Sequence, residues 1–272
     1  MPFGPLVDAA WLRAEISAPD LAVVDCRWRI GEPGAGEALW AAGHIPGAGF
    51  LDVDGDLSAP PGPGGRHPLP DPDEFARAAT RAGIAAGSRV VAYDDPSIGG
   101  AARLWWILRH LGHDSVAVLD GGIDAWLAKG GMLERCDGPA PGSPPFSPGP
   151  ALDDAVEAGG VPPAHGALVD ARSPERFRGD AEPLDPVAGH IPGAVNVPYT
   201  DLAPGGRYRS PAEIRARLAE AGADGGLTAY CGSGISACVV LLAAEHAGVS
   251  GRLYPGSWSD WSARGLPAET GG

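Results

Sequence analysis

Cys231 opens the segment Cys-Gly-Ser-Gly-Ile-Ser-Ala, between a strand-like run that ends at Tyr230 and a helix-like run over 238–246. A thiol at such a junction lies in a tight loop whose backbone N–H groups can point at it, and the following helix N-terminus adds partial positive charge. Both effects favour the thiolate, which is the nucleophilic form. Gly232 and Gly234 permit conformations that other residues resist. The spacing alone also fits a buried structural cysteine.

The chain carries the same landmarks twice, in the same order. Gly-His-Ile-Pro-Gly-Ala occurs at 43–48 and again at 189–194, and an Asp-x-Arg precedes each copy, at 25–27 and 170–172. Two further landmarks follow in both halves: a strand-like run with a tyrosine, then a glycine with a tryptophan shortly after it. We therefore predict two copies of one domain.

Comparison of the halves separates scaffold from chemistry. His44 and His190 occupy the same slot, as do the aspartates and arginines of the two Asp-x-Arg motifs, so these residues are expected to serve folding. Cys231 differs, because its counterpart is Asp94, which cannot act as a thiol nucleophile. The second half alone is expected to react.

Each half alternates short strand-like and helix-like runs, which predicts an α/β fold with a parallel sheet and helices on both of its faces. The predicted strands include 21–25, 89–93 and 227–230, and the predicted helices include 73–82, 98–111, 213–221 and 238–247. Asp71 or Asp73 is the expected cap of the first helix. Ligands of such sheets bind at the carboxyl ends of strands, where Cys231 lies.

A proline-rich segment predicts the domain boundary. Residues 139–150 contain six prolines and no charged residue, which is typical of an extended, stiff connection. We predict an N-terminal domain over 1–138, this linker over 139–150, and a catalytic domain over 151–272.

The composition fits a soluble enzyme. A net charge of −14 argues against nucleic acid or an anionic membrane as a partner. No apolar run reaches transmembrane length, and the N-terminus lacks the features of a signal peptide, so a cytoplasmic location is expected. The four cysteines form neither a disulfide framework nor a metal-ligand pattern, and we expect no metal or cofactor.

Together, the paired halves, the Asp-x-Arg, the Gly-His-Ile-Pro-Gly-Ala and the cysteine loop in the second copy resemble the two-domain rhodaneses. This resemblance covers nearly the whole chain and implies two tandem rhodanese-like domains. The Cys231 loop is similar to that of the mercaptopyruvate sulfurtransferases in this family. Thiosulfate-type members usually place basic residues directly after the cysteine, where this chain has Gly232 and Ser233. The resemblance implies sulfur transfer from a small-molecule donor, through a Cys231 persulfide, to a thiol acceptor such as a thioredoxin or a small thiol, or to cyanide.

The same resemblance implies the other site residues. Ser233 corresponds to a serine that relays a proton near the substrate, and Asp54 and His67 correspond to side chains that face the cleft in the mercaptopyruvate enzymes. The loop from Gly232 through Gly234, Ile235, Ser236 and Ala237 would bind the transferred sulfur. The residues alone also fit other roles: Asp54 a solvated turn carboxylate, His67 a loop histidine, and Ser233 a loop residue that bonds its own backbone.

The donor carboxylate requires cations, and here the chain departs from the family pattern. Arg176 matches the first of two expected arginines, but Leu184 stands at the position of the second. Arg178, Arg207 or Arg209 could substitute, and thiosulfate therefore stays open as the donor.

The sequence agrees less well with two other functional classes. Phosphatases of the Cys-x5-Arg type need an arginine six residues after the cysteine, where this chain has Ala237. A non-catalytic sulfur carrier or interaction module is a further alternative, which the intact cysteine loop disfavours.

Overall fold

The computed structural model describes residues 4–95, 99–135, 138–161 and 166–271, which form two compact units. Unit 1 comprises residues 1–59, 69–152 and 205–207; unit 2 comprises 60–68, 153–204 and 208–272. Each unit therefore includes a short piece of chain from the other half of the sequence. The domain limits at 138 and 151 stay a prediction.

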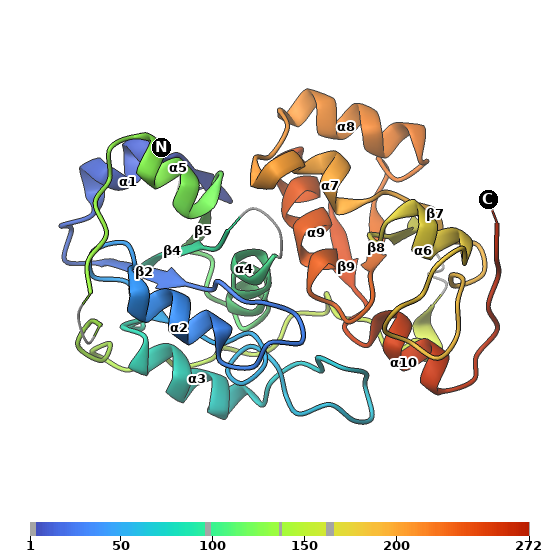
Figure 1. The fold of residues 1–272 in the computed structure, drawn as a ribbon, viewed down its shortest axis with the longest axis horizontal. Helices are drawn as coiled ribbons and strands as arrows, with labels where there is room; N and C mark the ends of the chain where they lie inside the picture. Colours follow the sequence, from blue (N-terminus) through green and yellow to red (C-terminus); the bar gives the residue numbers. More distant parts are fainter. Residues whose placement is uncertain (1–3, 96–98, 136–137, 162–165, 272) are drawn as a thin grey trace. The chain divides into compact units, whose positions relative to one another are not determined.

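Unit 1 is built on a five-stranded parallel sheet with the order β1-β5-β4-β2-β3 (Figure 1). Its strands are β1 (Leu6–Val7), β2 (Leu21–Asp25), β3 (Gly49–Phe50), β4 (Arg89–Tyr93) and β5 (Val116–Leu119). The central pair, β2 and β4, runs in register from Leu21 beside Arg89 to Asp25 beside Tyr93. These two strands are buried over nearly their whole length, as strands covered by helices on both faces should be.

Unit 2 repeats this plan with a four-stranded parallel sheet in the order β7-β6-β8-β9. Its strands are β6 (Ala167–Asp170), β7 (Val195–Asn196), β8 (Leu227–Tyr230) and β9 (Gly251–Leu253). Cys231 directly follows β8, the sheet's second central strand. The predicted parallel α/β class and the three predicted strand ranges are confirmed.

Helices cover both sheets. Those of unit 1 are α1 (Ala9–Glu15), α2 (Ala35–Ala42), α3 (Pro72–Arg81), α4 (Gly100–His110) and α5 (Gly122–Ala128). Those of unit 2 are α6 (Pro174–Arg178), α7 (Tyr199–Leu202), α8 (Pro211–Glu220), α9 (Ser236–His246) and α10 (Ser257–Ala263), with short 3-10 turns at Ala158–Gly160 and, in unit 1, around Gly205.

The predicted helices are present, with starts that differ by about two residues. Asp71 is the cap of α3 and accepts hydrogen bonds from the N–H groups of Asp73 and Glu74. Helix α9 begins at Ser236 rather than at 238. The preceding loop contains Gly234, which has a φ of 82° and is therefore not helical. The predicted first residue of α4, Ile98, lies outside the described residues.

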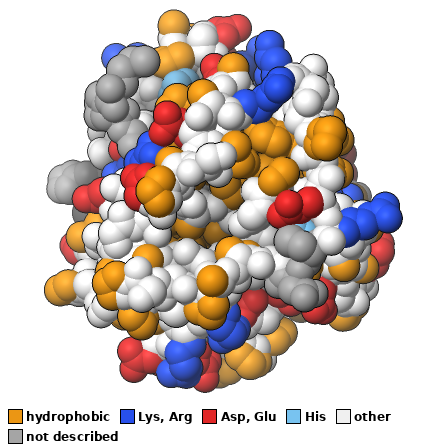
Figure 2. All heavy atoms as spheres, turned by 90° about the vertical axis from the view of Figure 1, so that its left-hand side faces the viewer, with side chains coloured by type: hydrophobic (Ala, Val, Ile, Leu, Met, Phe, Trp, Pro, Cys, Tyr) orange, Lys and Arg blue, Asp and Glu red, His pale blue; other side chains and the backbone are white. Residues whose placement is uncertain are grey.

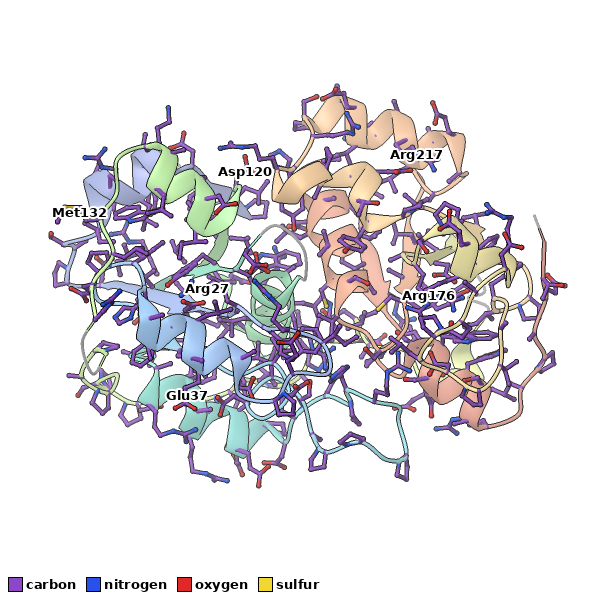
Figure 3. The ribbon with its side chains drawn as sticks, in the orientation of Figure 1. Arg27, Glu37, Asp120, Met132, Arg176 and Arg217 are labelled. Carbon is purple, nitrogen blue, oxygen red and sulfur yellow. The ribbon has the colours of Figure 1, made fainter. Side chains whose placement is uncertain are left out.

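The repeated Asp-x-Arg motif makes equivalent contacts in both units. The guanidinium of Arg27, which is labelled in Figure 3, binds the Asp25 carboxylate, with the shortest contact at 2.6 Å, and donates to the Gly43 carbonyl at 2.8 Å. Arg172 binds Asp170 in the same way, also at 2.6 Å. Both aspartates are fully buried. The motif therefore ties the end of a central strand to the segment that contains Gly-His-Ile-Pro-Gly-Ala.

The two histidines are likewise structural. The Nδ1 atoms of His44 and His190 lie 2.9 and 2.7 Å from the carbonyl oxygens of Trp40 and Phe177, and both rings are buried. Each histidine also exchanges two backbone hydrogen bonds with a glutamate near the end of its unit, Glu134 or Glu269. Each histidine therefore joins two segments of its own unit that are far apart in the sequence, which is a structural role.

The proline-rich segment 139–150 carries no helix or strand and packs on unit 1. The N–H groups of Gly142 and Gly149 donate to the carbonyls of Thr80 and Leu111, each at 2.8 Å. The segment therefore follows the surface of unit 1 before the chain enters unit 2.

The surface mixes charges of both signs, with acidic groups in excess over the whole sequence. Figure 2 shows acidic and basic side chains interspersed on one face, with apolar side chains between them. Among the described helices, none is both long and apolar enough to cross a membrane.

We expect the Arg27→Met variant to lower the free energy of unfolding of unit 1 by about 3–5 kcal/mol, because it leaves the Asp25 carboxylate buried without its cation. Arg29→Met is the matched control, since Arg29 is part-exposed and its ion pair with Asp95 should contribute at most about 1 kcal/mol. Denaturant unfolding followed by circular dichroism measures both. Equal losses in the two variants would contradict a special role for the buried pair.

Candidate active site

The Cys231 loop occupies residues 231–235, between the end of β8 and the start of α9. The sulfur of Cys231 accepts a hydrogen bond from the Gly234 N–H at 3.1 Å, and the residue is only 2% exposed. The loop therefore closes on its own cysteine. An N–H aimed at the sulfur stabilises negative charge there.

The first turn of α10 fixes the backbone of this loop. The N–H groups of Trp258 and Ser259 donate to the carbonyls of Cys231 and Gly232, at 3.0 and 2.9 Å. These donors belong to the helix start, where N–H groups have no partner within the helix. With both carbonyls held by α10, the peptide groups of the loop cannot rotate freely.

Ser257 adds a side-chain contact to the same interface. Its hydroxyl accepts from the Cys231 N–H at 3.1 Å and lies 2.9 Å from the Tyr254 carbonyl, to which it donates. Ser257 has a φ of 53°, in the left-handed region that normally favours glycine and costs other residues about 1–2 kcal/mol. A glycine would avoid this cost but would lose the acceptor for the Cys231 N–H.

The structure brings together two predicted residues that are far apart in sequence. The Nδ1 atom of His67 lies 2.7 Å from the Ser233 hydroxyl, and both side chains are buried. His67 belongs to the 60–68 segment of unit 2, so this contact lies within one unit. A histidine bonded to a hydroxyl two residues from a cysteine is an arrangement able to move a proton.

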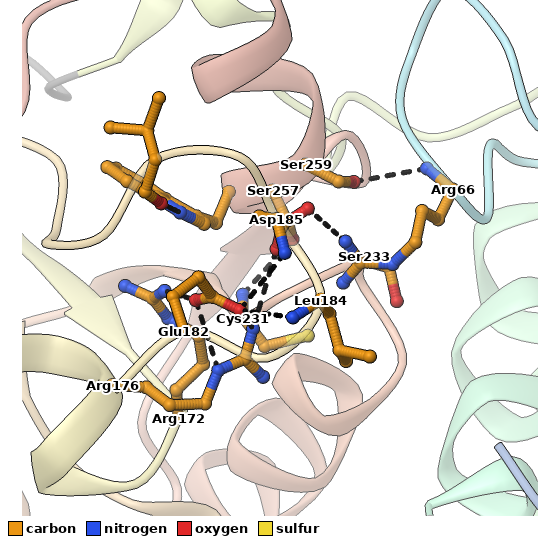
Figure 4. A network of polar contacts seen from close by, with 12 residues as sticks. Arg66, Arg172, Arg176, Glu182, Leu184, Asp185, Cys231, Ser233, Ser257 and Ser259 are labelled. Atoms are coloured by element: carbon orange, nitrogen blue, oxygen red, sulfur yellow. Dashed lines mark hydrogen bonds and ion pairs between the residues drawn. The ribbon is translucent and has the colours of Figure 1, made fainter. Parts of the chain in front are cut away.

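Arg176 lies over the loop, in a cluster of opposite charges (Figure 4). Its guanidinium binds Glu182 at 2.6 Å and Asp185 at 3.4 Å, and Glu182 also binds Arg172 at 3.1 Å. Burial would raise the pKa of Glu182, but the hydrogen bonds from Arg176 and the Leu184 N–H, with the charges of Arg176 and Arg172, together lower it. Burial raises the pKa of Asp185 despite its arginine partners.

A second arginine, which the sequence did not indicate, lies in the same cluster. Arg66 forms an ion pair with Asp185, opposite Arg176 (Figure 4). A Cβ on Gly232 would lie 2.8 Å from Nη2 of Arg66 and 3.4 Å from Nη1 of Arg176. Both guanidinium groups therefore converge on the residue directly after Cys231. The available signal was the position of Arg66 next to His67.

Asp54 belongs to unit 1, where its carboxylate accepts a hydrogen bond from the Trp28 indole at 2.8 Å. The contact fixes the carboxylate at the end of the segment that follows β3. Its neighbour Asp52 has a pKa raised first by burial and then by the charge of Asp54.

The other candidate cations lie in separate contacts. Arg178 binds the exposed Asp180 at 2.8 Å, and Arg209 donates to the Asp201 carbonyl at 2.6 Å. Arg207 lies in unit 1, 3.9 Å from Asp120. Leu184 is 46% exposed, so the position of the expected second arginine carries an apolar side chain at the surface.

Comparison with known proteins identifies the family. The model of the rhodanese-like domain matches residues 8–129 and 151–264. The chain belongs to the rhodanese family. It is a rhodanese sulfurtransferase with two tandem domains.

Two relatives of this rhodanese carry names with different donors. It is 44% identical to the "Probable 3-mercaptopyruvate sulfurtransferase" of Pseudomonas aeruginosa, over 94% of each chain. It is 42% identical to the "Putative thiosulfate sulfurtransferase SseB" of Mycobacterium tuberculosis, over 94% of this chain and 93% of the relative. The solved 3-mercaptopyruvate sulfurtransferase from Leishmania major matches with a TM-score of 0.85 and 31% identity, over 97% of this chain and 75% of that one. The relatives therefore agree on sulfur transfer but differ in the sulfur donor that their names give.

Among the residues that the structure describes, no group of three or more His, Cys, Asp or Glu side chains could hold a metal ion. Among the described residues, Cys26, Cys231 and Cys238 form no disulfide, and all three are buried. Cys238 lies in α9, and its thiol lies 3.3 Å from the Gly234 carbonyl.

Cys231→Ser should abolish persulfide formation, because no other described cysteine lies in the loop. Cys26→Ser and Cys238→Ser should retain most of the activity, and so should Cys136→Ser, although Cys136 lies outside the described residues. Intact-protein mass spectrometry after incubation with a sulfur donor should detect one added sulfur in all variants except Cys231→Ser. Addition of sulfur to Cys231→Ser would overturn the assignment of the nucleophile.

Proposed function

We propose that this rhodanese transfers sulfur from 3-mercaptopyruvate to a thiol acceptor through a persulfide on Cys231. The observation that carries the proposal is the hydrogen bond between His67 and Ser233, beside a cysteine loop that has no charged residue of its own. An uncharged loop with a paired histidine and serine suits a donor whose leaving group must gain a proton. The same uncharged loop is less suited to thiosulfate, which is a dianion.

The first half-reaction forms the persulfide. The Cys231 thiolate attacks the donor sulfur, a sulfur–sulfur bond forms, and the carbon–sulfur bond breaks. The carbon keeps the bonding electron pair and leaves as the enolate of pyruvate, which then takes up a proton. The Gly234 N–H, 3.1 Å from the Cys231 sulfur, stabilises the negative charge of the thiolate before the attack.

In this scheme, Ser233 and His67 supply the proton that the enolate takes up. The Ser233 hydroxyl is two residues from Cys231 and can donate to the enolate, while His67 replaces its proton through the 2.7 Å hydrogen bond. Asp54, in unit 1, is proposed as a catalytic acidic residue on the strength of its match to the family segment.

The second half-reaction returns the enzyme to its thiolate. An acceptor thiolate, from a thioredoxin-like protein or a small thiol, attacks the outer sulfur of the Cys231 persulfide, and the Cys231 thiolate leaves. Cyanide can take the same sulfur. A reducing compartment such as the cytosol would keep Cys231 as a working thiol.

Thiosulfate is the second candidate donor. The observation that favours it is the pair of guanidinium groups at Gly232, because two cations can also bind a dianion. In that reaction sulfite leaves with the electron pair of the sulfur–sulfur bond, and no carbon is protonated. Ser233 and His67 would then have no proton to supply.

The donor assignment predicts a higher kcat/KM for 3-mercaptopyruvate than for thiosulfate. The double variant Gly232→Arg, Ser233→Lys should reverse the preference, because it adds charge beside Cys231 and removes the His67 partner. Steady-state kinetics with both donors and one thiol acceptor measures the ratio, with Cys231→Ser as the blank. A wild-type protein that prefers thiosulfate by tenfold or more would refute the proposal.

Arg176→Ala should lower kcat/KM for 3-mercaptopyruvate by about ten- to a hundredfold, since a hydrogen bond to a charged group contributes roughly 1.5–3 kcal/mol. Arg178→Ala, two residues along α6, is the matched control, because Arg178 binds the exposed Asp180 instead. Equal kinetics in Arg176→Ala and the wild type would remove Arg176 from the donor site.

A further inference from the structure

We infer that Arg66 is the second anion-binding residue of the donor site and supplies the cation that Leu184 does not. The inference rests on the proposed function, because it assigns Arg66 to the carboxylate of a small 2-oxo acid. It concerns a residue of the 60–68 segment, which comes from the first half of the sequence and belongs to unit 2.

The backbone of this segment is held firmly on the α10 end of the active site. The N–H of Arg66 donates to the Ser259 hydroxyl at 3.1 Å, and the N–H of Gly64 donates to Asp260 at 3.3 Å. Gly65 approaches so closely that a Cβ there would lie 2.6 Å from the Ser259 hydroxyl. Since the N–H of Ser259 binds the Gly232 carbonyl, one residue connects Arg66 to the cysteine loop.

The side chain of Arg66 points at the loop. Its Nη2 lies 2.8 Å from the position that a Gly232 Cβ would take, and Nη1 and Nη2 of Arg176 lie 3.4 and 3.5 Å from the same position. Two guanidinium groups within 3.5 Å of one point form a fork that fits a carboxylate, since each can offer it two N–H groups.

Arg66 also has hydrogen-bonding capacity to spare. Its Nη1 binds Asp185, whereas its buried Nε has no hydrogen-bond acceptor anywhere in residues 4–95, 99–135, 138–161 and 166–271. A buried donor without a partner is costly, and a bound carboxylate would remove that cost. Asp185 lies between the two arginines and holds them in place, with a side chain only 4% exposed.

The chemistry selects a carboxylate beside a carbonyl. The two arginines lie at Gly232, the residue directly after Cys231. A donor whose sulfur lies at Cys231 and whose carboxylate lies between the arginines must therefore be short. A 2-oxo acid with its thiol on the third carbon has this length. The absence of a side chain on Gly232 keeps the space between the arginines open.

The test measures the binding of pyruvate, which carries the carboxylate and carbonyl without the sulfur. Its inhibition constant against 3-mercaptopyruvate turnover, and its dissociation constant by calorimetry, are compared for the wild type, Arg66→Gln and Arg178→Gln. We expect Arg66→Gln to weaken pyruvate binding and to raise KM for 3-mercaptopyruvate by about ten- to a hundredfold, with kcat changed less than threefold. Arg178→Gln should match the wild type.

Two further variants separate binding from folding. Gly232→Ala keeps every charge and should weaken pyruvate binding by displacing the Arg66 guanidinium, because its Cβ would lie 2.8 Å from Nη2 of Arg66. Leu184→Arg in the Arg66→Gln background should recover at least part of the lost affinity, which a purely structural role of Arg66 would not allow.

The outcomes distinguish this inference from the proposed function. The role of Arg66 is overturned if Arg66→Gln binds pyruvate within twofold of the wild type, or if the wild type does not bind pyruvate. The donor preference is then still decided by the wild-type kinetics. A wild type that prefers thiosulfate refutes the proposed function, whereas the effect of Arg66→Gln on pyruvate binding still decides whether Arg66 binds a carboxylate.

Discussion

The active site depends on the contact between the Cys231 loop and the first turn of α10. The N–H groups of Trp258 and Ser259 hold the carbonyls of Cys231 and Gly232, and the Ser257 hydroxyl holds the Cys231 N–H. With these three groups fixed, the loop has one orientation, and the Gly234 N–H can reach the sulfur. The left-handed conformation of Ser257 is the backbone cost of placing that hydroxyl.

Both units share one scaffold, but they differ at the residue that follows the central strand. Each has a buried Asp-Arg pair after a central strand and a tyrosine hydroxyl that accepts from the isoleucine of Gly-His-Ile-Pro-Gly-Ala, at 3.1 Å in both cases. At the cysteine position unit 1 has Asp94, whose carboxylate accepts from the Ala101 N–H at 3.0 Å. Burial raises the pKa of Asp94 to about 7. The same loop position thus holds an acid in one unit and a thiol in the other.

Charge around the cysteine comes from outside the loop. The loop residues are neutral, and the cations that approach it, Arg66 and Arg176, come from distant segments and are held by Asp185 and Glu182. A glycine at position 232 leaves room for Arg66, since a Cβ there would lie 2.8 Å from Nη2 of that arginine. In the proposed reaction this arrangement separates two tasks, since the loop stabilises sulfur while the arginines bind the rest of the donor.

The sequence by itself determined the features that depend on local order and repetition. The strand ranges 21–25, 89–93 and 227–230 and the place of Cys231 after a strand follow from short apolar runs, and the duplicated landmarks identified the paired units and the family. The cap of α3 was narrowed to Asp71 or Asp73, and the structure shows Asp71. Tertiary structure alone decided which distant residues meet. The residue separation between His67 and Ser233 is 166, and between Arg66 and Asp185 it is 119, and no local pattern encodes such distances. The sequence shows that Leu184 stands where an arginine was expected. That Arg66 takes its place depends on packing, because the neighbours of a side chain across a fold are set by how the backbone folds and not by its position in the sequence.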